Sequence, residues 1–85
     1  MTALVYKILT AAQWAAATRD GVFRGAPVDL ADGYVHLSAA DQVRETAARH
    51  FASAPDLVLA ACDPASLGPA LRWEASRGGA LFPHL

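Results

Sequence analysis

A shortage of large apolar side chains limits this chain to one small hydrophobic core. Apolar residues make up 54% of the 85 positions, but alanine accounts for 20 of those 46 residues and leaves 26 larger side chains. A chain of this length buries only about 60–65% of its unfolded surface, so its free energy of unfolding is expected to be modest. We therefore expect a single domain spanning residues 1–85.

Charge and apolar patterning exclude several classes of protein. A net charge of −1 gives no electrostatic basis for binding nucleic acid. No apolar run reaches the ~20 residues of a membrane span, and the first residues lack the basic segment of a secretory signal. Cys62 stands alone, so no internal disulfide can form. We expect a cytoplasmic protein that binds neither nucleic acid nor a membrane.

Hydrophobic periodicity predicts the order strand, helix, strand, helix, strand, strand, and then a short ordered segment. The predicted strands are 3–9, 33–38, 56–62 and 70–75, the helices are 11–19 and 39–52, and the last segment is 80–85. The apolar face of the first strand consists of Leu4, Tyr6 and Ile8. The opposite face carries Val5, Lys7 and Leu9. The third strand is apolar on both faces and is expected at the centre of the sheet. Residues 22–32 predict a loop.

Capping signals mark both helices. Thr10 and Gln13 fit a capping box, in which each side chain bonds a free backbone N–H of the other residue, and Gly21 ends that helix. Ser38 is a good N-cap for the second helix, and Asp41 lies at its third position, where the helix dipole favours a carboxylate.

These few short elements favour an α+β fold with a small, twisted, mainly antiparallel sheet and two helices. The chain ends on Phe82-Pro-His-Leu85, which leaves apolar side chains and a strand edge without partners. We therefore expect a domain truncated at its C-terminus that lacks the last strands of its sheet. An exposed edge near Leu81–Leu85 favours self-association.

The segment Tyr34-Val-His-Leu-Ser38 carries the most informative cluster. Tyr34, His36 and Ser38 share one face of a strand that runs into a helix N-terminus, where free N–H groups favour an anion. His36 would there carry a proton or contact a ribose hydroxyl. The alternative is a structural histidine at a sheet edge, hydrogen-bonded to Ser38 or to the backbone.

Two later segments add candidate residues. Arg72 and Glu74 lie two apart on a strand, so they either line a cleft together or form an exposed ion pair. Phe82 and His84 follow the flexible Gly78-Gly79 pair and either cover a pocket or belong to an edge strand. No histidine or cysteine pair has the tight spacing of known zinc sites, so we expect no metal.

Together these motifs resemble an uncharacterised bacterial family, domain of unknown function 952. The likeness covers essentially the whole chain and rests on four segments: Tyr6-Lys7-Ile8, Asp32-Gly-Tyr-Val-His-Leu-Ser38, Leu71-Arg-Trp-Glu74 and Phe82-Pro-His84. It implies a fold similar to that of ADP-ribosyltransferases, where a His-Gly-Thr-like motif contacts the nicotinamide ribose of NAD and a later glutamate orients it. His36 and Ser38 match that motif, Leu37 replaces its glycine, and Glu74 stands in for the glutamate.

Two functions remain open beside a third interpretation, a degenerate fragment with no activity of its own, and the sequence does not decide whether the protein is an enzyme. In the first, the chain is a nucleotide- or NAD-binding domain in which His36 and Glu74 are catalytic. Its ligand-binding residues would be Tyr34, Ser38, Arg72, Phe82 and His84. In the second, the same polar face belongs to a non-catalytic module that binds a protein partner or a small metabolite.

Overall fold

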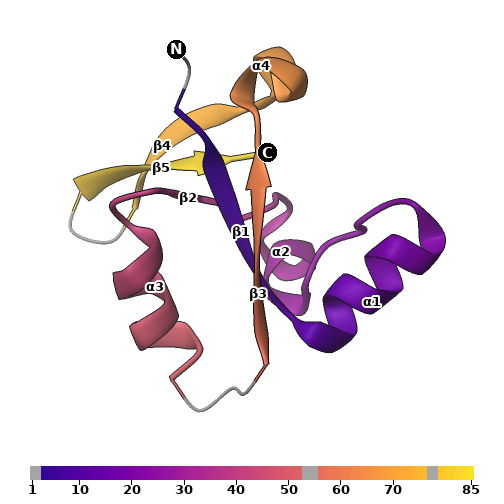
Figure 1. Cartoon of the computed structure of the whole chain (residues 1–85). Coiled ribbons are helices and arrows are strands. Elements are labelled where there is room, and N and C mark those ends of the chain that lie inside the picture. The colour runs from indigo at the N-terminus through magenta and orange to yellow at the C-terminus, as the bar shows by residue number, and fades with distance from the viewer. Residues whose placement is uncertain (1–2, 53–55, 77–78) are drawn as a thin grey trace.

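The computed structural model describes residues 3–52, 56–76 and 79–85, and these form two antiparallel sheets and four helices (Figure 1). The predicted α+β class with antiparallel pairing is therefore confirmed, although the chain has four helices and not two. The strands are β1 (Val5–Thr10), β2 (Ser38–Ala39), β3 (Leu57–Cys62), β4 (Arg72–Ser76) and β5 (Ala80–His84). The helices are α1 (Ala11–Asp20), α2 (Pro27–Asp32), α3 (Val43–His50) and α4 (Pro64–Leu67), followed by a 3₁₀ turn, η1 (Gly68–Ala70).

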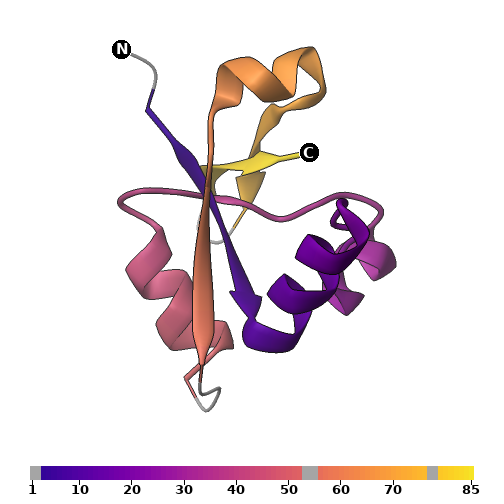
Figure 2. The same ribbon diagram turned by 45° about the vertical axis from the view of Figure 1, so that its right-hand side comes forward.

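The larger sheet has the order β2-β1-β3, and β4 and β5 form a separate hairpin. From either viewpoint, α1 and α2 lie to one side of β1 and β3, and α3 lies to the other (Figures 1 and 2). The expectation that segment 56–62 is central was wrong, because β1 is the single described strand that pairs with β3, and Leu57 and Leu59 are left exposed. An apolar run does not by itself distinguish a central strand from an edge strand.

Strand β1 is the central strand, and both of its faces are covered. Val5, Lys7 and Leu9 are buried along with Ile8, so the prediction that these three alternate residues point away from the core was wrong. The alternation of polar and apolar residues was misleading because the Lys7 ammonium donates to a buried carboxylate, that of Asp29, 22 residues further along the chain. A paired lysine can occupy a core position that an unpaired one cannot.

Helix α1 begins and ends as predicted. The backbone N–H of Gln13 donates to the Thr10 hydroxyl at 3.1 Å, and the N–H of Thr10 donates to Gln13 Oε1 at 3.0 Å. Gly21 has φ 74°, the left-handed conformation that ends many helices. The capping box is therefore confirmed.

Replacing Thr10 with alanine should lower the free energy of unfolding by about 1 kcal/mol, because the N–H of Gln13 loses its acceptor. Urea unfolding followed by circular dichroism measures this change. Thr18→Ala is the matched control, since the Thr18 hydroxyl is exposed and bonds only carbonyls within its own helix. Equal midpoints for the two variants would show that the capping box does not stabilise the fold.

The predicted loop at 22–32 contains α2. Pro27 occupies the first turn of this helix, and the N–H of Ala26 donates to Asp29 Oδ2 at 2.8 Å. Gly33, at φ 86°, ends it. A proline in the first turn followed by an aspartate is also typical of a helix start. These residues were predicted to form a loop, so the helix was missed.

The second predicted helix is shorter than expected. It begins at Val43, and Ser38 belongs to β2 instead of capping it. The Ser38 hydroxyl donates to Thr46 Oγ1 at 3.5 Å. The strand predicted at 33–38 is reduced to β2 and an isolated bridge between His36 and His84.

The end of the chain is paired, contrary to the expectation that it lacks partners. Phe82, Pro83 and His84 are buried. The N–H of Val35 donates to the Leu85 carbonyl at 2.8 Å, and the N–H of Leu85 donates back at 3.0 Å. Strand β5 therefore lies between β4 and the segment that carries His36. Of the Gly78-Gly79 pair that was predicted to be flexible, Gly78 lies outside the described residues.

Candidate functional site

A cleft of about 710 Å³ brings several predicted site residues together. His36 and Ser38 reach it from the segment before α3, and Phe82 and His84 reach it from β5. Its size lies within the range of small-molecule sites, about 300–1,000 Å³. The other walls come from β1, the start of α2 and the last turn of α3.

The pairing of β4 with β5 places four predicted residues on one face of the hairpin. Arg72 lies opposite His84, and Glu74 lies opposite Phe82. Directly opposite residues in an antiparallel pair point to the same side, and residues two apart do as well. Phe82 and His84 line the cleft, whereas Arg72 and Glu74 are exposed and lie outside its lining.

His84 is buried and bonded to Glu74. Its Nδ1 lies 3.1 Å from Glu74 Oε1, and its side chain is only 7% exposed. The Tyr34 ring packs against both histidines, with its centroid 4.3 Å from that of His84 and 4.5 Å from that of His36, and the two imidazoles meet edge-on at 5.7 Å. Tyr34 thus supports both imidazoles without lining the cleft itself.

His36 lies between two carboxylates. Its Nδ1 is 2.7 Å from Asp29 Oδ1, and its Nε2 is 2.9 Å from Asp32 Oδ2. Carboxylates only accept hydrogen bonds, so both contacts are hydrogen bonds when both ring nitrogens carry a proton. Ser38 and the backbone had been considered as alternative partners of the His36 ring. The ring bonds the two carboxylates instead. His36 and Glu74, both predicted to be catalytic, do not bond each other and belong to two different carboxylate–histidine pairs.

Asp29 is the buried acceptor that joins α2 to the core. It accepts from the Lys7 ammonium at 2.9 and 3.0 Å and from the backbone N–H of His36 at 3.0 Å, in addition to the Ala26 N–H and the His36 ring. Burial by itself raises the pKa of Asp29, but these hydrogen bonds outweigh it and hold the pKa below the usual value of 3.8.

Asp29 should therefore make the fold sensitive to acid. A carboxyl group whose pKa is lower in the folded state contributes stability that is present above its unfolded value of 3.8 and is lost as the pH falls through the folded pKa. We expect the free energy of unfolding to fall more steeply below that pH in the native chain than in the double variant Lys7→Met/Asp29→Asn, which lacks the carboxylate but leaves no buried ammonium without a partner. Urea unfolding across the acidic range measures both slopes, and parallel slopes would contradict this assignment.

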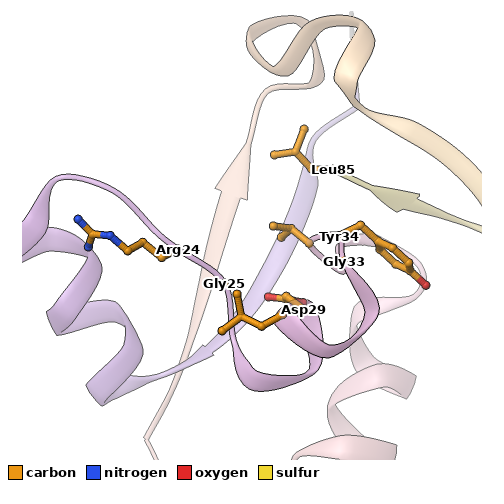
Figure 3. A pocket seen from close by; sticks show the side chains of 8 residues that line it. Arg24, Gly25, Asp29, Gly33, Tyr34 and Leu85 are labelled. Atoms are coloured by element: carbon orange, nitrogen blue, oxygen red, sulfur yellow. The ribbon is translucent and has the colours of Figure 1, made fainter.

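A smaller pocket of about 270 Å³ lies on the other side of Asp29 and is lined by Gly33, Tyr34 and Leu85 among others. Figure 3 shows the Arg24 side chain reaching away from the Asp29 carboxylate. Arg24 bonds Asp20 at 3.0 Å instead. This pocket holds no charged group without a partner that could select a ligand.

Sequence reasoning missed several residues of the cleft. Lys7 and Asp32 belong to the motifs that carried the family resemblance, but their role was not evident. Asp29, which bonds Lys7 and His36 without lining the cleft itself, gave no signal beyond its place in a predicted loop. Arg49 and His50 also line the cleft from the last turn of α3. Within the described ranges, no three His, Cys, Asp or Glu side chains are placed to hold a metal ion. No described helix is both long and apolar enough to cross a membrane.

The chain belongs to the family described as "Protein of unknown function (DUF952)", whose pattern matches residues 8–85. The crystal structure of protein CC0527 from Caulobacter crescentus is similar, with 57% sequence identity and a TM-score of 0.93, over 96% of this chain and 72% of that one. The solution NMR structure of CC0527 gives 57% identity and a TM-score of 0.84, over 96% and 71%. Among curated proteins, none matches. The predicted family is therefore confirmed.

Proposed function

We propose that the cleft binds a nucleotide-class ligand and that the chain is a nucleotide- or NAD-binding domain similar to ADP-ribosyltransferases. One observation carries this proposal: a single cleft of about 710 Å³ gathers His36, Ser38, Phe82 and His84 from segments far apart in the sequence. These side chains supply hydroxyl, imidazole and aromatic groups within one site, which suits a sugar joined to a flat base.

The remaining lining residues support a ligand with a negative charge. Lys7 and Arg49 are the lysine and arginine of the lining, whereas Asp32 is its one carboxylate among the described residues. Lys7 is held by the buried Asp29, but Arg49 pairs with the exposed Glu45 at 3.1 Å, and a surface ion pair of this kind is weak enough for a phosphate to replace. Arginine binds phosphate oxygens well because its planar fork donates two parallel hydrogen bonds. Phe51 and Phe82 add aromatic surface on which a base can pack. The cleft therefore offers separate surfaces for a phosphate and a base.

The proposal gives each predicted site residue a role. Ser38, Phe82 and His84 contact the ligand, and Tyr34 supports the two imidazoles. His36, held in a fixed orientation by Asp29 and Asp32, presents its ring to the bound nucleotide. Glu74 acts through His84, and Arg72 lies opposite His84 on the hairpin.

Calorimetric titration with NAD, adenosine monophosphate and inorganic phosphate tests the proposal. Arg49→Gln should weaken binding of the nucleotides by about tenfold or more, because a charged hydrogen bond to phosphate is lost. Arg44→Gln is the matched control, since Arg44 is exposed on the same helix and does not line the cleft. The proposal fails if none of the three ligands binds more tightly than about 1 mM, or if the two variants bind alike.

A non-catalytic binding module is the second candidate, and the free edge of β3 favours it. Leu57 and Leu59 are 37% and 53% exposed there, and no described strand pairs with that edge. The edge predicted near Leu81–Leu85 is instead covered by β4 and residues 35–37. Exposed apolar edge strands pair readily with other chains. A dimer by size-exclusion chromatography that Leu59→Lys converts to a monomer would support self-association through β3.

A further inference from the structure

One ring nitrogen of His84 is buried and has no hydrogen-bond partner among the described residues. Nδ1 is engaged by Glu74 at 3.1 Å, the side chain is 7% exposed, and the residue lines the cleft. Buried polar atoms are almost always hydrogen-bonded, to protein groups, to ordered water or to a ligand. Nε2 is therefore an acceptor position that a molecule in the cleft would satisfy.

Glu74 determines which ring nitrogen can accept. A carboxylate cannot donate, so the contact between Glu74 and Nδ1 requires a proton on Nδ1, and in the neutral ring the lone pair then lies on Nε2. The Tyr34 ring, 4.3 Å away between centroids, packs against the imidazole and restricts its rotation. His36 differs, because Asp29 and Asp32 occupy both of its nitrogens. Of the two histidines that contact Tyr34, only His84 has a lone pair to offer.

We propose that His84 is the proton acceptor of the cleft, that Glu74 is its positioning residue, and that the group it receives is a hydroxyl of the ligand. The hydroxyl first donates a hydrogen bond to Nε2. In a proton transfer, the O–H bond breaks as the Nε2–H bond forms, and the electron pair stays on oxygen. The new positive charge of the ring then lies beside the Glu74 carboxylate. Only the assignment of the hydroxyl to a ribose rests on the proposed function.

The tautomer of His84 tests this assignment without any ligand. Long-range proton–nitrogen NMR on the neutral imidazole distinguishes a protonated ring nitrogen from a bare one. We expect Nδ1–H and a bare Nε2 in the native chain, and a shift of the population toward Nε2–H in Glu74→Ala. Arg72→Ala is the matched control, since Arg72 shares the strand and the face of Glu74 but makes no hydrogen bond to His84. Nε2–H in the native chain, or no response to Glu74→Ala, would overturn the proposal.

A second comparison tests the hydroxyl. Adenosine monophosphate should bind about tenfold more tightly than an analogue without ribose hydroxyls, because the analogue leaves Nε2 buried and unpaired. His84→Phe, which keeps an aromatic ring, should reduce that preference to near unity. A preference unchanged in His84→Phe would overturn the role of His84. If neither nucleotide binds, the nucleotide function fails, while the tautomer measurement still decides whether His84 is an acceptor.

Discussion

Asp29→Asn is expected to lower the free energy of unfolding by about 3–5 kcal/mol, enough to unfold much of a small domain. Asp29 is 3% exposed and is the carboxylate partner of the buried Lys7 ammonium. Removing its charge leaves that ammonium buried without a counter-charge, and such a loss costs far more than breaking a surface ion pair. Chemical denaturation followed by tryptophan fluorescence measures the change.

Two further variants keep this prediction open to contradiction. Asp32→Asn is the matched control, because the Asp32 side chain is 47% exposed and should cost less than about 1 kcal/mol. Lys7→Met removes the buried ammonium that Asp29→Asn leaves without a counter-charge. The double variant Lys7→Met/Asp29→Asn should therefore be more stable than Asp29→Asn alone. Equal costs for Asp29→Asn and Asp32→Asn, or purely additive effects in the double variant, would show that the buried pair does not stabilise the fold.

Phe82→Ala is expected to cost about 3–5 kcal/mol, because it removes a buried ring and leaves a cavity. Phe82 is 7% exposed and packs where β5 meets the rest of the fold. Its neighbour Leu81 is 55% exposed on the opposite face of the same strand, so Leu81→Ala should change stability by less than about 1 kcal/mol.

Urea unfolding of Phe82→Ala and Leu81→Ala measures the two costs. A cost for Phe82→Ala no larger than that of Leu81→Ala would mean that β5 is not anchored through this ring. A large cost would confirm that the last strand is an integral part of the core and not a loose edge.

Local sequence signals predicted the elements whose causes are themselves local. The capping box at Thr10 and the left-handed Gly21 depend on neighbouring residues, and both were predicted. The alternation of β4 placed Arg72 and Glu74 on one face, and the β4–β5 register confirms this. What the pattern could not predict were partners distant in sequence. Lys7 was placed on the face opposite the apolar one, because the carboxylate that permits its burial lies on a helix that was predicted as a loop.

The structure brings four of the predicted site residues into one cleft, while Tyr34, Arg72 and Glu74 lie outside its lining. His36, Ser38, Phe82 and His84 do share one cleft, which no periodicity argument could have shown. The sequence left open whether His36 and Glu74 meet, and they do not, because Glu74 bonds His84, while Asp29 and Asp32 bond His36. Pairings of this kind depend on which segments become neighbours, and here the pairing of residues 35–37 with β5 decided them.

The most direct test of the central claim is a two-dimensional NMR titration of the chain with NAD. Binding in the cleft should shift the ring resonances of His36, Phe82 and His84 together. Leu59, on the free edge of β3, and Trp73, on the opposite face of the hairpin, should stay unchanged. His50 also lines the cleft and therefore cannot serve as an unmoved reference. Silent cleft resonances at millimolar NAD, or shifts centred on Leu59, would contradict the assignment of this cleft as a nucleotide site.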